Sequence, residues 1–263
     1  ASPAARTTLL GVERMARASV ALTRLRRDDR ERAALWPEHT PEDQLGLVYA
    51  SEAMAELVKT TRRIAPSTAT VLITGETGAG KEVVARALHQ ASGRSGTFLP
   101  FNCTTVPRDM LDSQLFGYRR GAFTGAVEEY QGLIRSAEHG TLFLDEIGEM
   151  PLELQPKLLR FLEAGEILPF GETRPIHVDV RIVAATNADL DQLVGEGRFR
   201  EDLYYRLNVI RLRVPPLRER REEVPLLVQS LLDRFAREAQ REAIRVSEEA
   251  MEYLALYHWP GNA

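Results

Sequence analysis

The sequence lacks a second cysteine, a long apolar run and a signal-peptide pattern, and each absence excludes a class of protein. Its single cysteine, Cys103, cannot form a disulfide within the chain, so an oxidising compartment is not implied. No apolar run approaches the roughly 18–20 residues that a membrane span needs. Residues 1–11 have no charged stretch followed by an apolar core, which a secretory signal requires. We therefore expect a cytoplasmic protein without a membrane partner.

The sequence also has no paired metal ligands and no excess of positive charge. Its five histidines are dispersed, and none is paired at metal-ligand spacing, so we interpret them as structural or surface residues. Lysine and arginine number 34 against 38 aspartates and glutamates, a formal net charge of -4, which gives little support to nucleic acid as the main partner. What is present, 263 residues with 44% hydrophobic and 27% charged, suits one large soluble domain or two small ones.

From residue 45 onward, short apolar runs alternate with amphipathic stretches. Helices are expected after Ser51, after the glycine-rich turn near residue 80, and at 152–163. Strands that alternate with helices are typical of an α/β domain with a parallel sheet. The expected strands are 70–74, 98–102, 141–145, 180–185 and 209–214, and the residues expected to point inward from the helix after the turn are Val83, Val84, Ala87 and Leu88.

By composition the chain divides into three segments. Residues 1–44 carry a dense charge run and form either a solvated helix or a dimerising or signalling helix between domains. Residues 45–214 hold the alternating pattern. The strand signal ends at Pro215, and residues 215–263 form a helical appendage. Its two expected helices are 224–242 and 247–257.

A glycine-rich turn between an expected strand and an expected helix matches the phosphate-loop pattern G-x-x-x-x-G-K. Its glycines let backbone N–H groups cradle phosphate oxygens, and Lys81 supplies a positive charge to the β- and γ-phosphates. The helix that follows adds the positive end of its dipole. Glu82 departs from the pattern, because Ser or Thr usually stands there and helps to hold Mg²⁺. The predicted nucleotide-binding residues are Gly75, Glu76, Thr77, Gly78, Ala79, Gly80, Lys81 and Glu82.

Two carboxylates close the apolar strand expected at 141–145. Asp145 is placed to bind Mg²⁺ through water, and Glu146 is placed to polarise an attacking water as a general base. An Asp-Glu pair is weak evidence alone, but with a phosphate loop upstream it favours hydrolysis over binding alone. Because Glu82 replaces the usual hydroxyl, Mg²⁺ must rely more on water, phosphates and Asp145.

The hexapeptide at 121–126 reads G-A-F-T-G-A, and with it the sequence resembles the bacterial enhancer-binding proteins, the sigma-54-dependent AAA+ transcription activators. The resemblance covers about residues 45–263. It implies an α/β fold: a P-loop AAA+ parallel-sheet sandwich, the ATPase subdomain at 45–214, followed by a small helical lid subdomain at 215–263. The segments that carry it besides the hexapeptide are 102–103, 115–117, 145–150, 185–187, 199–208, 216–220 and 259–262.

The resemblance implies that the hexapeptide is a loop that presents Phe123 to sigma-54. Small residues on each side of Phe123 and Thr124 allow the loop to move and the ring to be exposed. The partner-binding residues are then Gly121, Ala122, Phe123, Thr124, Gly125 and Ala126.

The resemblance also implies catalytic roles for polar residues beside Glu146. Asn102 would hold the Glu146 carboxylate through its side-chain amide. Asn187, just past an apolar strand, would contact the γ-phosphate or the attacking water. Arg200 and Arg206 would be arginine fingers that reach a neighbouring subunit's γ-phosphate. Hydrolysis would then require a ring homo-oligomer, a hexamer or heptamer by resemblance.

The sequence departs from the family at several positions. Leu47 and Val48 would line the adenine pocket, and Tyr49 stands beside them where the family commonly has glycine. At Pro169 the family commonly has an arginine of the second pore loop region, so that arginine is missing here. The chain stops at Ala263, before the lid's second sensor arginine and the usual helix-turn-helix domain. We therefore expect an incomplete lid, and contact with DNA only through a domain absent from this chain.

These features predict a Mg²⁺-dependent ATPase that remodels sigma-54 RNA polymerase and so activates transcription. Two alternatives remain: an AAA+ ATPase that remodels a different protein, and a module whose assembly is controlled by nucleotide without productive hydrolysis. The hexapeptide argues against the first alternative. The acidic pair and the two candidate fingers argue against the second. Turnover per chain that rises with protein concentration would indicate fingers acting between subunits.

Overall fold

The computed structural model describes residues 47, 49–122, 128–241 and 245–262. The segment 1–44, Val48 and the hexapeptide positions 123–126 lie outside the described residues, so the predictions made for them stay predictions. The described chain divides into two compact units, which are treated separately below. The larger comprises residues up to Arg220 together with 258–262, and the smaller is Arg221–Tyr257.

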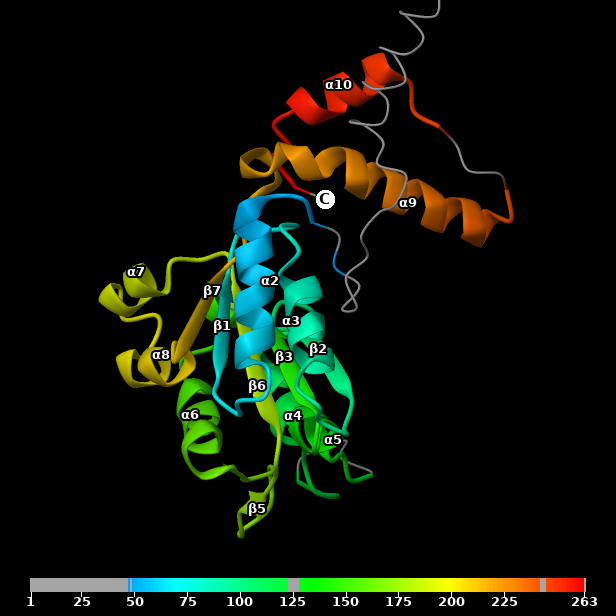
Figure 1. Ribbon diagram of the computed structural model, residues 1–263. Coiled ribbons are helices and arrows are strands. Elements are labelled where there is room, and N and C mark those ends of the chain that lie inside the picture. Colours follow the sequence, from blue (N-terminus) through cyan, green and yellow to red (C-terminus); the bar gives the residue numbers. More distant parts are fainter. Residues whose placement is uncertain (1–46, 48, 123–127, 242–244, 263) are drawn as a thin grey trace, which may run out of the picture. The chain divides into compact units, whose positions relative to one another are not determined.

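The larger unit is built on a sheet of five parallel strands in the order β2-β3-β6-β1-β7 (Figure 1). Every strand predicted from the sequence is present, and 98–102 and 141–145 have the predicted bounds. The other three begin one residue later than predicted. The strands are β1 Val71–Thr74, β2 Phe98–Asn102, β3 Thr141–Asp145, β6 Arg181–Thr186 and β7 Ile210–Arg213.

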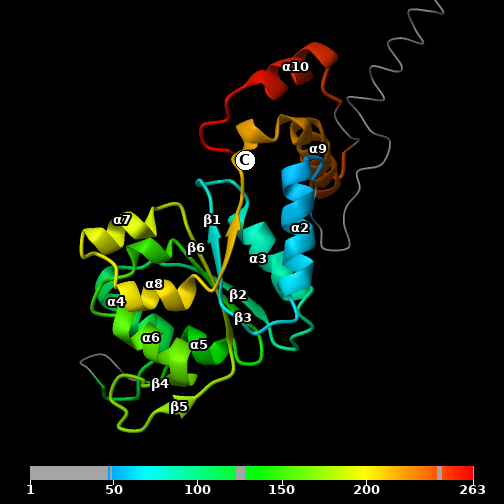
Figure 2. The same cartoon turned by 60° about the vertical axis from the view of Figure 1, so that its left-hand side comes forward.

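Helices cover both faces of this sheet (Figure 2). On one face lie α2 (Glu52–Ile64) and α3 (Lys81–Gln90). The other face carries five helices and a 3-10 turn: α4 Arg108–Phe116, α5 Gly132–Ser136, η1 Ile147–Glu149, α6 Gln155–Ala164, α7 Leu190–Gly195 and α8 Glu201–Leu207. The short antiparallel pair β4 (Glu166–Ile167) and β5 (Ile176–His177) follows α6.

Side chains alternate between the two faces along each strand, because successive residues of a strand point in opposite directions. Leu142 and Leu144 of β3 lie in the cluster under α4–α8, whereas Phe143 between them packs with α2 and α3. The three inner strands β1, β3 and β6 therefore read as nearly continuous apolar runs, as expected of a parallel sheet buried on both sides. Burial of each such leucine or phenylalanine contributes roughly 1.5–3 kcal/mol relative to exposure.

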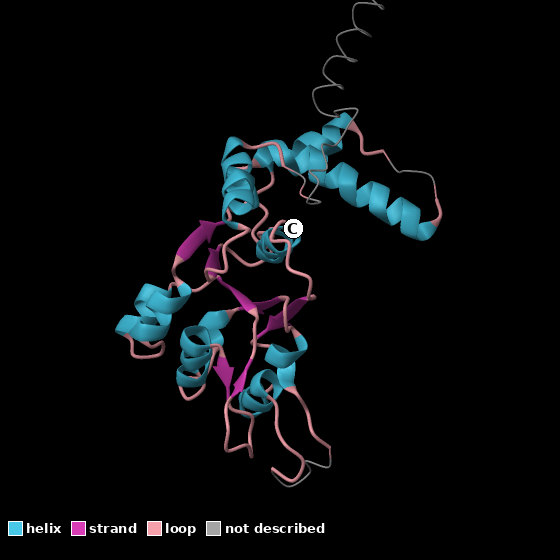
Figure 3. Ribbon diagram, turned by 60° about the horizontal axis from the view of Figure 1, so that its bottom comes forward, coloured by secondary structure: helices cyan, strands magenta, loops and turns pink. Residues whose placement is uncertain are grey.

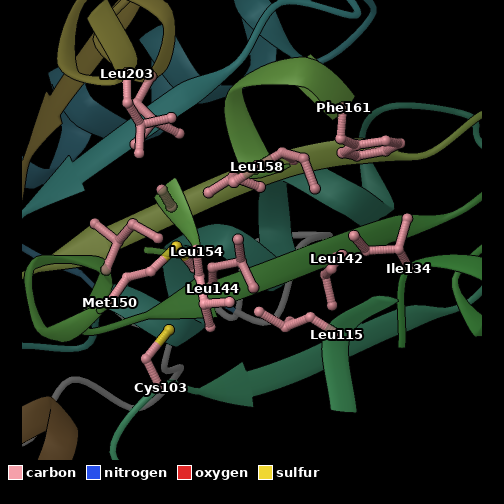
Figure 4. Close-up of a cluster of buried hydrophobic side chains, with 14 of the residues drawn as sticks. Cys103, Leu115, Ile134, Leu142, Leu144, Met150, Leu154, Leu158, Phe161 and Leu203 are labelled. Carbon is pink, nitrogen blue, oxygen red and sulfur yellow. The ribbon is translucent and has the colours of Figure 1, made fainter. Parts of the chain in front are cut away.

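Cys103 belongs to the cluster under α4–α8 (Figure 4). The side chain is 2% exposed, and burial, followed by the nearby Asp145 and Glu146 charges, raises the pKa of its thiol to about 12. A thiol in that state is neither a nucleophile nor a metal ligand at neutral pH. Cys103 is therefore a small buried thiol of the hydrophobic core.

The two helices on the other face begin as the sequence predicts, with one correction. Ser51 caps α2 by accepting the N–H of Met54 through its side chain. On α3 the inward residues include Val84, Ala87 and Leu88, but the prediction for Val83 is wrong: it is 48% exposed. The buried face of α3 is formed by Lys81, Val84, Ala85, Ala87 and Leu88, and Val83, one residue and about 100° before Val84, lies beyond the edge of that face.

The smaller unit is helical (Figure 3). A 3-10 turn, η3 (Arg221–Glu223), leads into α9 (Val224–Ala239), and α10 (Glu248–Leu256) begins where the Ser247 side chain accepts the N–H of Ala250. Both helices were predicted. The sequence-based division after Val214 differs from the division of the structure, which falls after Arg220 and returns 258–262 to the larger unit. In the described part of the chain, no helix has the length and apolarity to cross a membrane.

Candidate functional site

The carboxyl ends of the parallel strands bring the predicted polar residues to one edge of the sheet. Asn102 and Asp145 are paired in register at the ends of β2 and β3. Thr74 and Thr186 are paired at the ends of β1 and β6, so the glycine-rich loop and Asn187 leave the sheet side by side. β1 and β6 are neighbours in the sheet, and the helix that follows β1 covers one face whereas the helices that follow β6 cover the other. In open parallel sheets ligands bind at this topological position.

The phosphate loop, residues 75–81, has the backbone needed to surround an anion. Gly78 and Gly80 have φ values of 74° and 95°, which only glycine adopts without strain. Gly80 is the N-cap of α3 and offers no capping side chain, so the N–H groups of the first turn remain available to an anion. Lys81 is 6% exposed, and its Nζ donates to the carbonyl oxygens of Gly75 (3.0 Å) and Glu76 (3.2 Å). A buried ammonium held at the loop is suited to phosphate oxygens.

The acidic pair lies beside this loop in a constrained conformation. Glu146 has a φ of 51°, in the left-handed region that residues other than glycine rarely adopt. Asp145 accepts the N–H of Glu146 at Oδ1 (3.0 Å) and Nδ2 of Asn102 at Oδ2 (3.2 Å). The side-chain NH2 group of Asn102 therefore donates to Asp145 in this structure, and not to Glu146 as the resemblance implies, while its Oδ1 accepts from Thr104. The side-by-side register of β2 and β3 accounts for this, because it sets Asn102 directly opposite Asp145.

Glu146 is held instead by two groups from other elements. Its Oε1 is 3.6 Å from Nζ of Lys81, and its Oε2 accepts the backbone N–H of Asn187 (3.2 Å). Nδ2 of Asn187 in turn donates to Oγ1 of Thr77 in the phosphate loop (2.9 Å). Lys81, Glu146, Asn187 and Thr77 thus form one connected group. Such a group can bind phosphate and hold a carboxylate ready to accept a proton from water.

The residues at this edge fit a magnesium ion held mainly by water and phosphates. Asp145 offers hard carboxylate oxygens, which Mg²⁺ prefers, and Mg²⁺ usually keeps several waters. Glu82 is turned along the exposed side of α3, where its carboxylate accepts from Nη2 of Arg86 at 2.8 Å. The residues that the structure describes contain no cluster of three or more His, Cys, Asp or Glu suited to a metal. Asp145, and not Glu82, is therefore the side chain suited to this ion.

The two candidate fingers lie on α8. Arg200 is its N-cap residue, and its guanidinium makes a two-pronged contact with Asp202: Nε to Oδ1 at 3.0 Å and Nη2 to Oδ2 at 2.7 Å. This pairing raises the pKa of Arg200 and lowers that of Asp202. Arg206 donates through Nε and Nη2 to the carbonyl oxygen of Leu162 near the end of α6. Both side chains are exposed, so the structure places them on the surface and not in the group around Lys81.

Sequence reasoning missed a set of contacts behind the phosphate loop. Arg218 donates to both carboxylate oxygens of Glu76, at 2.7 and 2.5 Å. Asn262 is 5% exposed and donates to the carbonyl oxygen of Thr77 (2.9 Å) and to Oε2 of Glu76 (3.3 Å). Its own Oδ1 accepts the N–H of Leu217 (2.7 Å). The loop is thus supported from outside by two segments far along the chain.

Arg220 requires a correction. A cluster of arginines at 218, 220 and 221 suggests from the sequence a solvated, interface-facing turn and not a nucleic-acid site. In the structure, however, Arg220 is 7% exposed and donates from Nη2 to the carbonyl oxygen of Ala79 (2.7 Å). The sequence holds one signal for these contacts: Glu76 is a charged residue within a glycine-rich loop, which suggests that a basic side chain pairs with it. It does not say which arginine, because Arg218 lies 142 residues away.

The Glu76 contacts predict a pH dependence of stability. The side-chain hydrogen bonds from Arg218 and then Asn262 lower the pKa of Glu76 from 4.5 to about 2. A lowered pKa means that this stabilisation is complete above pH 4.5 and is lost as the pH falls toward about 2. In the Glu76→Gln variant, the free energy of unfolding should fall less steeply across that window. Urea unfolding at a series of pH values measures the slope.

The control for this experiment is Glu163→Gln, an exposed glutamate on α6, which should keep the wild-type slope. Identical slopes for Glu76→Gln and wild type would show that the Arg218 contact does not lower the pKa of Glu76.

The base of the hexapeptide loop is described up to Ala122. Tyr118 pairs with Tyr130 across the loop and with Phe170, and the N–H of Arg119 donates to the carbonyl oxygen of Phe170 (3.0 Å). Arg119 also lies 3.6 Å from Glu172. The segment with Pro169 in place of the expected arginine therefore contacts the loop base through its backbone.

The predicted adenine-pocket residue Leu47 is 4% exposed and packs with Val58 of α2 and Ala87 of α3. Tyr49 is partly buried against the same cluster. Leu47 thus lies within the apolar packing beside α3, the helix that follows the phosphate loop, and its role toward adenine stays a prediction.

Comparisons with known proteins match both units. Residues 47–213 match the sigma-54 interaction domain, and residues 218–263 match the AAA+ ATPase lid domain. The regulatory protein AtoC of Escherichia coli is 53% identical over 213 residues, which cover 81% of this chain and 46% of AtoC. NtrC of Rhizobium meliloti is 48% identical over 229 residues, 86% of this chain and 46% of NtrC. The chain thus spans about half the length of these curated relatives.

Solved structures agree with these matches. The crystal structure of NtrX from Brucella abortus in complex with ATP has a TM-score of 0.75 and 35% identity. The likeness covers 94% of this chain and 55% of that one. The Hsp104–ADP complex of Saccharomyces cerevisiae, with 17% identity and a TM-score of 0.52, shares the fold alone.

Proposed function

Because the chain belongs to the family of the sigma-54 interaction domain, we propose that it hydrolyses ATP and uses the energy to remodel sigma-54 RNA polymerase. One observation carries the proposal: Lys81 and Thr77 of the phosphate loop, Glu146 after β3 and Asn187 after β6, which come from three separate segments, are connected at the carboxyl edge of the sheet. This arrangement combines phosphate binding with a carboxylate positioned by hydrogen bonds.

Each residue of the group has a distinct part in the proposed reaction. The phosphate-loop amides and Lys81 hold the β- and γ-phosphates and offset their charge. Glu146 accepts the proton of the attacking water, and the N–H of Asn187 keeps its carboxylate oriented. Asp145 would hold Mg²⁺, which neutralises charge on the transferred phosphoryl group.

The proposed reaction is completed by a second copy of the chain. Arg200 and Arg206 are exposed on α8, and their guanidinium groups are suited to neutralise negative charge on a γ-phosphate. We assign them to the neighbour's site in a ring of identical subunits, a hexamer or heptamer as the family resemblance implies. The cytoplasm is the location consistent with this role.

We assign the binding of sigma-54 to the hexapeptide loop, and the Phe123→Ala variant tests this assignment. The variant should lose capture of sigma-54 in a pull-down with an ATP transition-state analogue, because the aromatic ring at position 123 is the proposed contact. ATP affinity should be unchanged, since the substitution leaves the phosphate loop intact. Phe235→Ala, which removes a 52%-exposed ring from α9, is the matched control and should capture sigma-54 normally.

The outcomes also separate the alternative functions. Unchanged capture by Phe123→Ala would remove the loop from the interface. ATP turnover without any sigma-54 capture by the wild-type chain would favour a different protein target. Nucleotide-dependent assembly without turnover would favour an assembly module.

A further inference from the structure

Gln155 opens α6 as a completely buried amide with three backbone hydrogen bonds. Its Nε2 donates to the carbonyl oxygens of Met150 (3.0 Å) and Arg198 (3.2 Å). Its Oε1 accepts the backbone N–H of Arg200 (2.8 Å). We infer that Gln155 is a positioning residue: it sets the backbone that carries Arg200 against the turn that begins at Glu146. This inference rests on the proposed function.

One end of the connection is the turn that follows the acidic pair. Glu146 is the N-cap residue of η1, and Met150 is its C-cap residue. The N–H of Glu149 bonds to the carbonyl oxygen of Glu146 (3.0 Å), and that of Met150 bonds to Ile147 (3.1 Å). Because the turn is this short and internally bonded, the position of the Met150 carbonyl is tied to the position of Glu146.

The other end is the segment that leads into α8. Phe199 is 2% exposed in the core, and the N–H groups of Arg198 and Phe199 both donate to the carbonyl oxygen of Leu193. Gln155 bonds to the residues on either side of Phe199. The N–H of Arg200 precedes the helix, and Gln155 provides its acceptor. The side-chain amide of Gln155 therefore fixes the backbone position from which the Arg200 side chain extends into solvent.

The chemistry of this position requires an amide. Two carbonyl oxygens need donors and one N–H needs an acceptor, and a glutamine side chain supplies both kinds. Leucine would leave all three backbone groups unpaired in a buried place. An ionised glutamate would face two carbonyl oxygens without a hydrogen to donate. A buried polar group with every bond made holds its neighbours in one geometry.

The consequence differs from that of an ordinary core defect. If Arg200 acts in the next subunit, a displaced Arg200 impairs the neighbour's hydrolysis and leaves the subunit's own site complete. Gln155→Leu should therefore lower kcat about tenfold or more with KM for ATP nearly unchanged. Gln192→Leu, the same change at an exposed glutamine of α7, should leave both constants unchanged.

Mixing experiments with the 263-residue chain test this directly. Gln155→Leu subunits are mixed with Glu146→Gln subunits, which have a disabled site but an intact Arg200. Turnover should rise to a maximum near equal proportions. An active site is complete only where a Gln155→Leu subunit supplies Glu146 and an adjacent Glu146→Gln subunit supplies Arg200. Arg200→Ala mixed with Glu146→Gln is the reference and should be rescued in the same way.

A second variant does not depend on Gln155→Leu folding well. In Gln155→Glu, a protonated carboxyl group can donate to one carbonyl while its other oxygen accepts from Arg200. Its turnover relative to wild type should increase as the pH is lowered from about 8 to about 6.

Each outcome has a meaning. Wild-type kcat in Gln155→Leu, or failure of its rescue while Arg200→Ala is rescued, overturns the positioning role. A pH profile of Gln155→Glu parallel to wild type does the same. If the Arg200→Ala reference is not rescued, the proposed action between subunits fails, and this inference falls with it.

Discussion

The Glu146→Gln chain is expected to bind ATP and not to turn it over. A general base contributes about 10²–10⁴-fold to a reaction rate, and the amide of glutamine cannot accept the proton of the attacking water. The substitution keeps the shape of the side chain and an oxygen that can accept the N–H of Asn187. It removes the charge that lies 3.6 Å from Lys81, so a phosphate would meet less repulsion. Nucleotide affinity should therefore be kept or increased.

Two measurements check this result: phosphate release at saturating ATP and equilibrium binding of a fluorescent ATP analogue. Glu163→Gln, an exposed glutamate of α6, is the matched control and should retain wild-type turnover. Turnover within a few-fold of wild type in Glu146→Gln would remove Glu146 as the base. Loss of binding together with turnover would indicate damage to the phosphate loop instead.

The Arg200→Ala chain is expected to lose about 10³–10⁵-fold in turnover, the usual contribution of an arginine finger. Its stability should change little, because the Arg200–Asp202 pair is exposed and exposed ion pairs contribute little. Arg206→Ala should differ, since Arg206 also joins α8 to the end of α6 through Leu162. We expect Arg206→Ala to lower the melting temperature as well as the turnover. Because Arg206 has this structural contact and Arg200 does not, we assign Arg200 as the principal finger.

Turnover per chain should be measured across protein concentration for each variant. Wild-type turnover should rise as subunits assemble, and Arg200→Ala should stay low at every concentration. Arg200→Lys should recover little, because an ammonium lacks the planar fork of the guanidinium. Arg63→Ala, at an exposed position on α2, is the control. Full turnover in Arg200→Ala with a defect in Arg206→Ala would reverse the assignment of the two residues.

Most of the fold was predictable because its signals are local. The apolar run at 141–145 gives the exact bounds of β3, and the Ser51 side chain caps α2 as its position before an amphipathic stretch suggests. The phosphate loop was predictable for the same reason, since the glycines and Lys81 lie within one short segment. Val83 shows the limit of such patterns, because an apolar residue at the edge of an amphipathic stripe can lie on either side of the boundary, and packing places Val83 outside it.

The contacts among the site residues were less predictable, because they join segments that are far apart along the chain. Asn102 bonds to Asp145 through strand register, which the resemblance did not supply. Arg218 meets Glu76 across 142 residues, and Asn262 meets Thr77 across 185. Gln155 carries no sequence signal, since an isolated glutamine at the start of a helix is usually exposed.

The sequence by itself determined which chemistry this chain holds: a loop for phosphate, a pair of carboxylates, and the hexapeptide that points to a partner. Those features depend on residue type and short spacing, which a sequence states directly. Only the tertiary structure decided which side chains support them. The tertiary structure buries Gln155 and Asn262, and a buried polar group must find partners wherever the fold brings them.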